Sequence, residues 1–167
     1  MLSDSFNQLP DNARVWIFPL LSPLSEAQAE ALRARLNEFL DNWLTHKAPT
    51  NARYELRDSQ FLIVAATTGA DQISGCAIDT LFHAVTKCLN DLGTAVGDRS
   101  VVFFRDASHS IQSVSRDEFQ ELVNREKVTA DTIVFDTTHH TLAALRKEPW
   151  ERPFSTAWHA QAFLRPG

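Results

Sequence analysis

The hydrophobic residues of this chain follow two kinds of pattern. Short apolar stretches, rich in β-branched and aromatic residues, are typical of buried strands. They are Val15–Phe18, Phe61–Ala66, Val101–Phe104 and Ile133–Phe135. Other segments repeat apolar residues every three or four positions, which indicates helices with one buried face. The chain is therefore expected to combine buried strands with amphipathic helices.

Two of the helical segments begin with a capping box. Ser25 is followed by Gln28, and this helix is expected to run to about His46 or Lys47, before Pro49. The second capping box, Ser115 with Glu118, begins a helix that runs to about Glu126.

The most regular helical pattern follows Ser74 and ends at Gly93, a residue suited to a helix C-terminus. At 100° per residue, one face of this helix carries Ile78, Leu81, Phe82, Val85, Leu89 and Leu92. On the same ideal helix, Cys76 falls opposite this stripe and Cys88 falls towards its edge. Cys76 is therefore the thiol expected to be accessible.

The order of the elements predicts the fold class. Arg53–Arg57 and Phe61–Ala66 flank three polar residues, a turn too short for a parallel crossover, so they are expected to form an antiparallel hairpin. The full order matches a split β-α-β, or ferredoxin-like, arrangement with helices on one face of a mainly antiparallel sheet. We predict this α+β fold, with Glu148–Gly167 as a C-terminal extension of loop and short helix. A doubly wound parallel sheet is the alternative, because several strands lack polar alternation.

Length and composition favour a single globular domain over residues 1–167. The chain has 167 residues, of which 44% are hydrophobic and 22% charged, which is close to the globular average and argues against disorder. The net charge is −5 and the basic residues are scattered, so neither nucleic acid nor an anionic membrane is expected as a partner. Two cysteines, no leader-like start and no run of about 18 apolar residues predict a soluble, cytoplasmic protein.

Candidate chemistry concentrates at the start of the helix that follows Ser74. Cys76 falls in its first turn, where free backbone N–H groups stabilise an anion. Asp79 lies about one turn away, and its carboxylate opposes a neighbouring thiolate. The sequence leaves the balance between these effects open. His46 and His159 are the candidate proton acceptors for this thiol, with Asp79 as the group that orients the base.

The remaining motifs are mostly exclusions. None of the five glycines forms a P-loop or a dinucleotide-binding turn, and there is no G-x-S-x-G or H-E-x-x-H motif. His139 and His140 are adjacent and would point to opposite sides of a strand, so they are a poor metal pair. No metal and no cofactor is predicted, and a metal site at Cys76 would require histidines to converge on it.

Several short motifs resemble a family of uncharacterised bacterial proteins often labelled "ABC transporter ATPase". They are Arg14-Val15-Trp16-Ile17, Trp43-x-x-His46, Ser74-Gly75-Cys76-x-Ile78-Asp79, Thr132-Ile133-Val134-Phe135 and Trp158-His159. The resemblance covers nearly the whole chain, and it places His46, Cys76, Asp79 and His159 in motif positions. The ATPase label does not fit this chain, which has no Walker A lysine to bind phosphate.

The sequence departs from the family pattern at two places. Lys47-Ala48 stands where the family has His followed by Gly, and Ala77 stands where it has Ser. A serine hydroxyl at position 77 is therefore not essential to any shared chemistry. The resemblance implies no established activity.

Two functional hypotheses follow from these residues. The favoured one is a non-catalytic binding or assembly module, with a protein partner or a second copy of the chain, in which the motif residues cap helices and anchor the tail. The alternative is a thiol-centred enzyme or redox-responsive protein that uses Cys76 with His159 or His46. The ligand or substrate is not indicated by the sequence.

Overall fold

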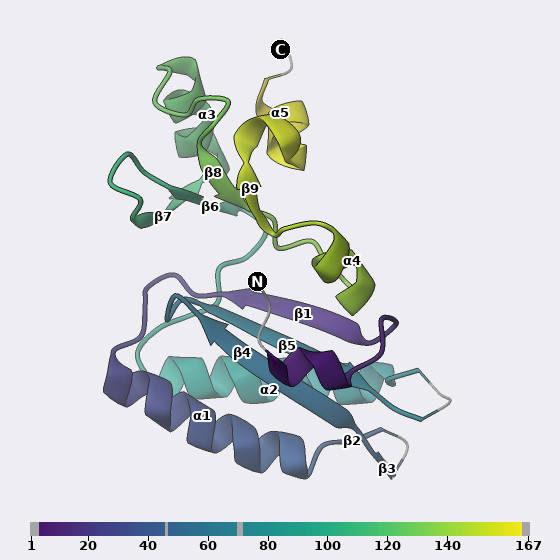
Figure 1. The fold of residues 1–167 in the computed structure, drawn as a ribbon. Coiled ribbons are helices and arrows are strands. Elements are labelled where there is room, and N and C mark those ends of the chain that lie inside the picture. The colour runs from purple at the N-terminus through teal and green to yellow at the C-terminus, as the bar shows by residue number, and fades with distance from the viewer. Residues whose placement is uncertain (1–3, 46, 70–71, 165–167) are drawn as a thin grey trace. The chain divides into compact units, whose positions relative to one another are not determined.

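The computed structural model describes residues 4–45, 47–69 and 72–164. Its contacts divide into two compact units (Figure 1). Unit 1 comprises the described residues of 1–96 and 139–147, and unit 2 those of 97–138 and 148–167. The expectation that residues 1–167 behave as one globular domain stays a prediction, because compactness alone does not say whether the two units unfold together.

Unit 1 contains a three-stranded antiparallel sheet. Its strands β1 (Arg14–Pro19), β4 (Asn51–Arg57) and β5 (Phe61–Thr67) lie in the order β1-β5-β4. The hairpin predicted from the short polar turn is confirmed as β4 and β5. Strand β5 is buried from residue 61 to residue 66, as expected for an apolar strand with two neighbours.

Helices α1 (Glu26–Asp41) and α2 (Gly75–Asp91) cover one face of this sheet (Figure 1). The capping box predicted at Ser25 is present, and Ser74 caps α2 by accepting a hydrogen bond from the Ala77 N–H. Their apolar faces pack against Trp16, Phe18, Leu62, Val64 and Ala66 of the sheet. Two strongly predicted helices therefore close the main core of unit 1.

The first helix is shorter than the sequence predicts. It ends at Asp41 instead of continuing to His46 or Lys47. The next residues form a small hairpin, in which β2 (Leu44–Thr45) pairs with β3 (Ala48–Pro49). At this end the Asn42 side chain donates to the Glu38 carbonyl oxygen, and the Trp43 carbonyl oxygen accepts from Thr50 across the hairpin. These bonds take the place of the next helical turn.

Phe82 is the second correction within unit 1. The sequence placed it in the buried stripe of α2, but its side chain is 45% exposed. It packs edge-on against Phe18, with 5.0 Å between ring centroids, at the margin of the core. The stripe that is buried is shifted around the helix, away from Phe82 and towards Ala77 and Cys88.

The opposite side of unit 1 carries short elements from both ends of the chain. These are η1 (Asp4–Gln8), which contacts β4, and α4 (Leu142–Lys147). The Arg146 side chain donates hydrogen bonds to the carbonyl oxygens of Phe6 and Leu9 and also pairs with Asp11. A single bridge between Arg14 and Thr141 lies beside β1.

Unit 2 has its own sheet, in the order β7-β6-β8-β9 with antiparallel pairing throughout. Its strands are β6 (Val101–Arg105), β7 (Ile111–Ser115), β8 (Ile133–Phe135) and β9 (Glu151–Pro153). Its helical elements are α3 (Arg116–Asn124), η2 (Phe154–Thr156) and α5 (Trp158–Phe163). Phe119 of α3 contacts the rings of Phe104, Phe154 and Phe163 at the centre of this core.

The structure is thus α+β, and every strand pairing among the described residues is antiparallel, which excludes the doubly wound alternative for them. The ferredoxin-like order is not evident from these pairings. Its expected fourth strand, β6, bonds to β7 and β8 in the second sheet instead of to β1. Strands β7 and β9 were not predicted, because their short sequences carry only a weak apolar pattern. None of the helices in the described ranges is long and apolar enough to cross a membrane.

Candidate functional site

Cys76 and Asp79 lie in the first two turns of α2, and both side chains are exposed. The predicted accessibility of Cys76 is confirmed. Among the described residues, neither side chain takes part in a hydrogen bond or an ion pair. The first turn of α2 therefore presents a thiol to solvent without a described partner that would act as its base.

Of the two candidate bases, the structure describes only His159, and it belongs to a different unit from Cys76. His46 lies outside the described residues. His159 belongs to unit 2, whereas Cys76 and Asp79 belong to unit 1. Unit 1 therefore holds Cys76 and Asp79 without His159.

His159 is a buried histidine in an aromatic environment. Its side chain is 2% exposed and stacks on Trp158 with 3.9 Å between ring centroids. Burial lowers the pKa of His159 to about 4, with Arg116 acting in the same direction and Asp136 opposing it. Its Nδ1 atom is buried without a hydrogen-bond partner in the described structure. The imidazole is consequently neutral near pH 7 and packs like an apolar ring.

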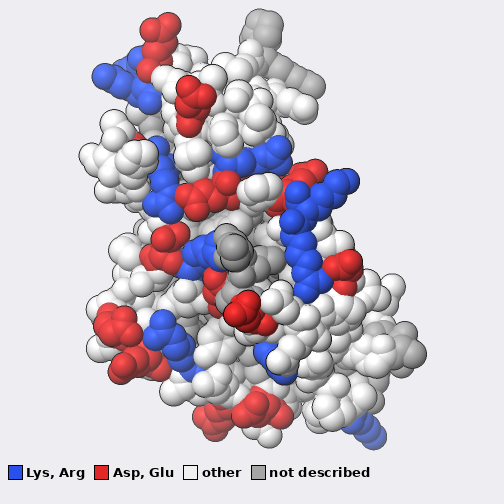
Figure 2. Space-filling view, viewed as in Figure 1, with Lys and Arg blue, Asp and Glu red and all other residues white. Residues whose placement is uncertain are grey.

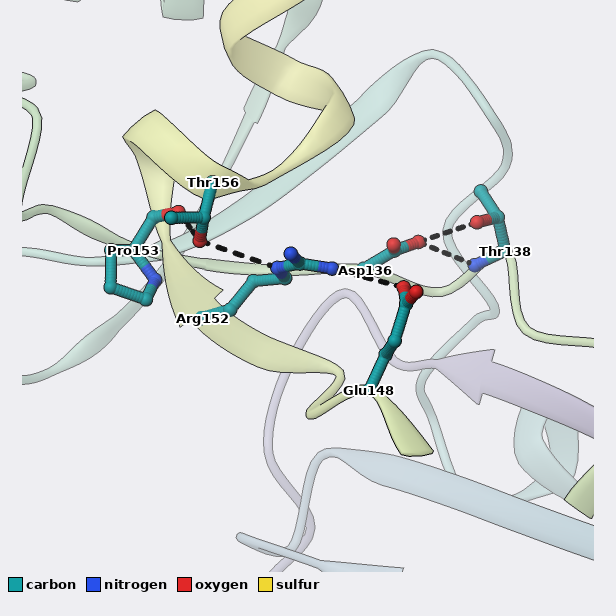
Figure 3. Close-up of polar contacts among 6 residues, drawn as sticks. All are labelled: Asp136, Thr138, Glu148, Arg152, Pro153 and Thr156. Carbon is teal, nitrogen blue, oxygen red and sulfur yellow. Dashed lines mark hydrogen bonds and ion pairs between the residues drawn. The ribbon is translucent and has the colours of Figure 1, made fainter. Parts of the chain in front are cut away.

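Two groups of polar side chains in unit 2 are shown in Figure 3, one around Arg152 and one around Asp136. Arg152 pairs with Glu148 at 3.2 Å and donates from Nε to the Thr156 hydroxyl at 3.4 Å. Asp136 accepts hydrogen bonds from the backbone N–H and the hydroxyl of Thr138. These contacts bind the ends of β8 and β9 to their own loops, so they stabilise the local structure of unit 2.

The site that sequence reasoning missed is a pocket between α1 and α2. It has a volume of about 620 Å³. Its apolar lining is Leu36, Phe39, Trp43, Leu44, Ala84 and Cys88, and its polar lining is Arg35, Glu38, Asn42, Thr80 and Lys87. Helical periodicity identifies residues that face a core but does not reveal where two neighbouring helices leave space. The one local signal of this pocket was the predicted position of Cys88 at the edge of the apolar stripe.

The two helices that form the pocket run antiparallel and are tied together at both ends. At one end, the Gln28 side chain donates to the Leu92 carbonyl oxygen at 2.6 Å. At the other end, the Trp43 indole N–H donates to the Ala77 carbonyl oxygen at 2.9 Å. The pocket lies between these ties, so its walls are fixed by the packing of unit 1.

Trp43 presents an apolar surface in this pocket because its only polar atom is already used in the bond to Ala77. Its ring lies 5.9 Å from both Trp16 and Phe39, measured between centroids. Leu44 follows it at the rim and is 51% exposed. This end of the pocket is therefore aromatic and aliphatic.

Charged residues gather at the other end of the pocket. Arg35 Nη2 lies 3.0 Å and Lys87 Nζ lies 3.2 Å from the same carboxylate oxygen, Oδ2 of Asp91. The hydrogen bonds from Lys87 and Arg35 hold the pKa of Asp91 below its usual range. Cys88 also lines the pocket and is 3% exposed. Burial raises the pKa of its thiol.

A second, smaller pocket of about 360 Å³ lies near the start of β1 and the end of β5. Its lining includes Asn12, Arg14, Thr68, Gly69 and Gln72, and positions 70 and 71 between the last two are outside the described residues. No aromatic side chain is among its described lining residues, so it offers less apolar surface for a ligand than the α1–α2 pocket.

Charge and metal-ligating groups do not mark another site. On the face shown in Figure 2, Lys and Arg are interspersed with Asp and Glu. In the described ranges, no three His, Cys, Asp or Glu side chains are grouped so that they could hold a metal ion. The prediction that nucleic acid and membrane are not partners stays a prediction.

Comparison with protein-family models, with curated proteins and with solved structures gives no match for this chain. Its function is therefore argued from the geometry of its own residues.

Proposed function

We propose that the protein is a non-catalytic binding module in which the α1–α2 pocket of unit 1 holds a small, mainly apolar ligand. The observation that carries this proposal is the pocket itself, which joins an aromatic and aliphatic lining to a few polar groups at its rim. A volume of about 620 Å³ is within the range of small-molecule sites, and such a lining is their usual composition.

The chemistry of the lining supports binding over catalysis. The Cys88 thiol is buried and its raised pKa keeps it protonated, which makes it a weak nucleophile. His83 of α2 is not among the lining residues, and His46 lies outside the described residues. The groups that do line it can hold and orient a ligand but include no activated nucleophile with a base.

A titration monitored by nuclear magnetic resonance tests this function. The full-length, ¹⁵N-labelled protein is titrated with 1-octanol and, separately, with octanoate, two probes with the same apolar chain. Saturable shifts of the Ala84 and Cys88 backbone amides are expected with at least one probe. If neither probe shifts these amides, the pocket does not bind small apolar molecules and the proposed function is wrong.

Two substitutions on α2 make the test specific to the pocket. Ala84→Phe places a ring in the cavity and is expected to abolish binding. Thr86→Phe adds the same ring at an exposed position that does not line the pocket, so binding is expected to persist. Equal binding by both variants would mean that the probes bind elsewhere.

The alternative function is a thiol-centred enzyme or redox-responsive protein based on Cys76. The exposure of this thiol in the first turn of α2 supports it. Its test is the labelling experiment described in the Discussion. Membership in the bacterial family that the motifs resemble likewise stays a prediction, and the absence of a P-loop argues against ATP hydrolysis in either case.

A further inference from the structure

The α1–α2 pocket is electrically asymmetric along its length. Arg35 and Lys87 bring two positive charges to one end, where Asp91 supplies a single negative charge. Glu38, the remaining charged residue of the lining, lies one helical turn after Arg35, towards Asn42 and Trp43. One end of the pocket therefore keeps an excess positive charge.

Hydrogen-bonding capacity at this end is also incompletely used. A guanidinium has five N–H donors and an ammonium three. In the described structure, the side chains of Arg35 and Lys87 both bond to the one Asp91 oxygen and have no other described partner. The side chains of Arg35 and Lys87 are 39% and 75% exposed, so their remaining donors are open to a ligand.

The charges of Arg35, Lys87 and Asp91 also act on a group inside the pocket, the Cys88 thiol. Among the charges that act on the Cys88 thiol, Arg35 is the strongest and by itself outweighs Asp91, and Lys87 adds to Arg35. Arg35 and Lys87 therefore act on this position in the direction that favours an anion, and Asp91 acts in the opposite direction.

From this asymmetry we infer that the pocket takes an amphipathic monocarboxylate, whose carboxylate accepts from the donors of Arg35 and Lys87 that Asp91 does not use and whose alkyl or aryl body lies against Phe39, Trp43 and Leu44. This inference rests on the proposed function and adds the charge and orientation of the ligand. A carboxylate matches the donor geometry of Arg35, and the apolar body removes the exposed Leu44 from water. An ammonium of the same length would be repelled by Arg35 and Lys87, and an alcohol would offer them only an uncharged acceptor.

Three probes of equal chain length test the charge. The ¹⁵N-labelled full-length protein is titrated with octanoate, 1-octanol and octylammonium, and dissociation constants are taken from the Ala84 and Cys88 amides. Octanoate is expected to bind about tenfold more tightly than 1-octanol, and octylammonium more weakly than both. The octanoate affinity is expected to fall as salt is raised, while the 1-octanol affinity does not.

Substitutions at the rim test the orientation. Arg35→Gln and Lys87→Gln are each expected to weaken octanoate binding about threefold to tenfold and to leave 1-octanol binding unchanged, since an exposed charge contributes modestly. Arg33→Gln is the matched control, because Arg33 is an exposed arginine of α1 outside the lining, and no change is expected.

The possible results separate the two proposals. If 1-octanol or octylammonium binds as tightly as octanoate, the carboxylate inference is wrong while the binding function stands. The same conclusion follows if Arg35→Gln and Lys87→Gln leave octanoate binding unchanged. If no probe binds, the proposed function fails, and the inference fails with it.

Discussion

The indole N–H of Trp43 donates a hydrogen bond of 2.9 Å to the main-chain carbonyl oxygen of Ala77, 34 positions along the chain. This bond joins the residue that follows the end of α1 to the first turns of α2. It also directs the Trp43 ring into the α1–α2 pocket with no free polar atom. A single tertiary bond thus ties the segment after the first helix to the second helix and shapes the aromatic end of the candidate site.

Trp43→Phe is expected to lower the free energy of unfolding by about 1–3 kcal/mol, because it removes a buried hydrogen bond and leaves a small cavity. Urea denaturation measures the change. Trp16→Phe is the matched control within the same core, since the Trp16 indole makes no comparable hydrogen bond in the described structure. An equal loss in both variants would show that ring size, and not the bond to Ala77, determines the effect.

Substitutions along α2 are expected to differ according to the face they occupy. Leu81→Ala should cost about 2–5 kcal/mol, because Leu81 is fully buried in the main core of unit 1. Lys87→Ala should cost less than about 1 kcal/mol, because Lys87 is exposed and loses only a surface ion pair with Asp91. Urea midpoints of the two variants give the comparison, and equal midpoints would contradict the assigned orientation of α2.

The two cysteines are expected to react at different rates in the native protein. Iodoacetamide should label Cys76 faster than Cys88, because Cys76 is exposed whereas Cys88 is buried and burial raises its pKa. Peptide mass spectrometry at several pH values follows each site separately. If Cys76 stays unlabelled until the protein is denatured, its thiol is structural and the thiol-centred alternative fails.

The same labelling assay tests whether His159 acts on Cys76. If His159 is the base of the thiol, His159→Ala should change how the Cys76 labelling rate depends on pH while leaving the unfolding midpoint unchanged. The aromatic packing of His159 leads us to expect the reverse, namely a lower midpoint and an unchanged Cys76 profile.

Stability is expected to fall on acidification because of His159. In the unfolded chain a histidine takes up its proton near pH 6.5, but folded His159 does so only near pH 4. Between these values the unfolded state binds more protons, so the free energy of unfolding decreases as pH falls, by about 1.4 kcal/mol per pH unit and about 3 kcal/mol in all. Above pH 6.5 this effect is absent.

Urea unfolding of the wild type and of His159→Phe between pH 7 and pH 4 measures this difference. The variant keeps an aromatic ring beside Trp158 but has no group that titrates, so its stability should decline less. The carboxylates with lowered pKa, such as Asp91 and Glu118, lose their contributions at lower pH and equally in both proteins. Parallel stability curves would show that His159 is not the cause.

Much of the local structure was predictable because its causes lie within a few residues. The capping boxes at Ser25 and Ser115 and the cap at Ser74 each begin a helix as expected. Gly93, with φ of 84°, follows α2 at the predicted position. The exposure of Cys76 followed correctly from its place on the helix.

The candidate site was harder to predict because it depends on packing between distant segments. Neither Ala84 nor Lys87 carries a local signal of a ligand site, since the pocket exists only where α1 and α2 lie side by side. The burial of His159 could not be predicted from its local sequence either, because its neighbours Phe119 and Arg116 come from another helix.

The sequence by itself thus determined the α+β class, the hairpin of β4 and β5 and the capped helices, since hydrophobic period, caps and turns act over a few residues. Only the tertiary structure decided that β6 bonds to β7 and β8 instead of to β1, that Trp43 leaves α1 to bond Ala77, and that Arg35 and Lys87 meet at Asp91. These outcomes depend on which of several possible hydrogen-bond and charge partners lies within reach after folding. The packing of the whole unit selects these partners, and it depends on residues that are far apart in the sequence.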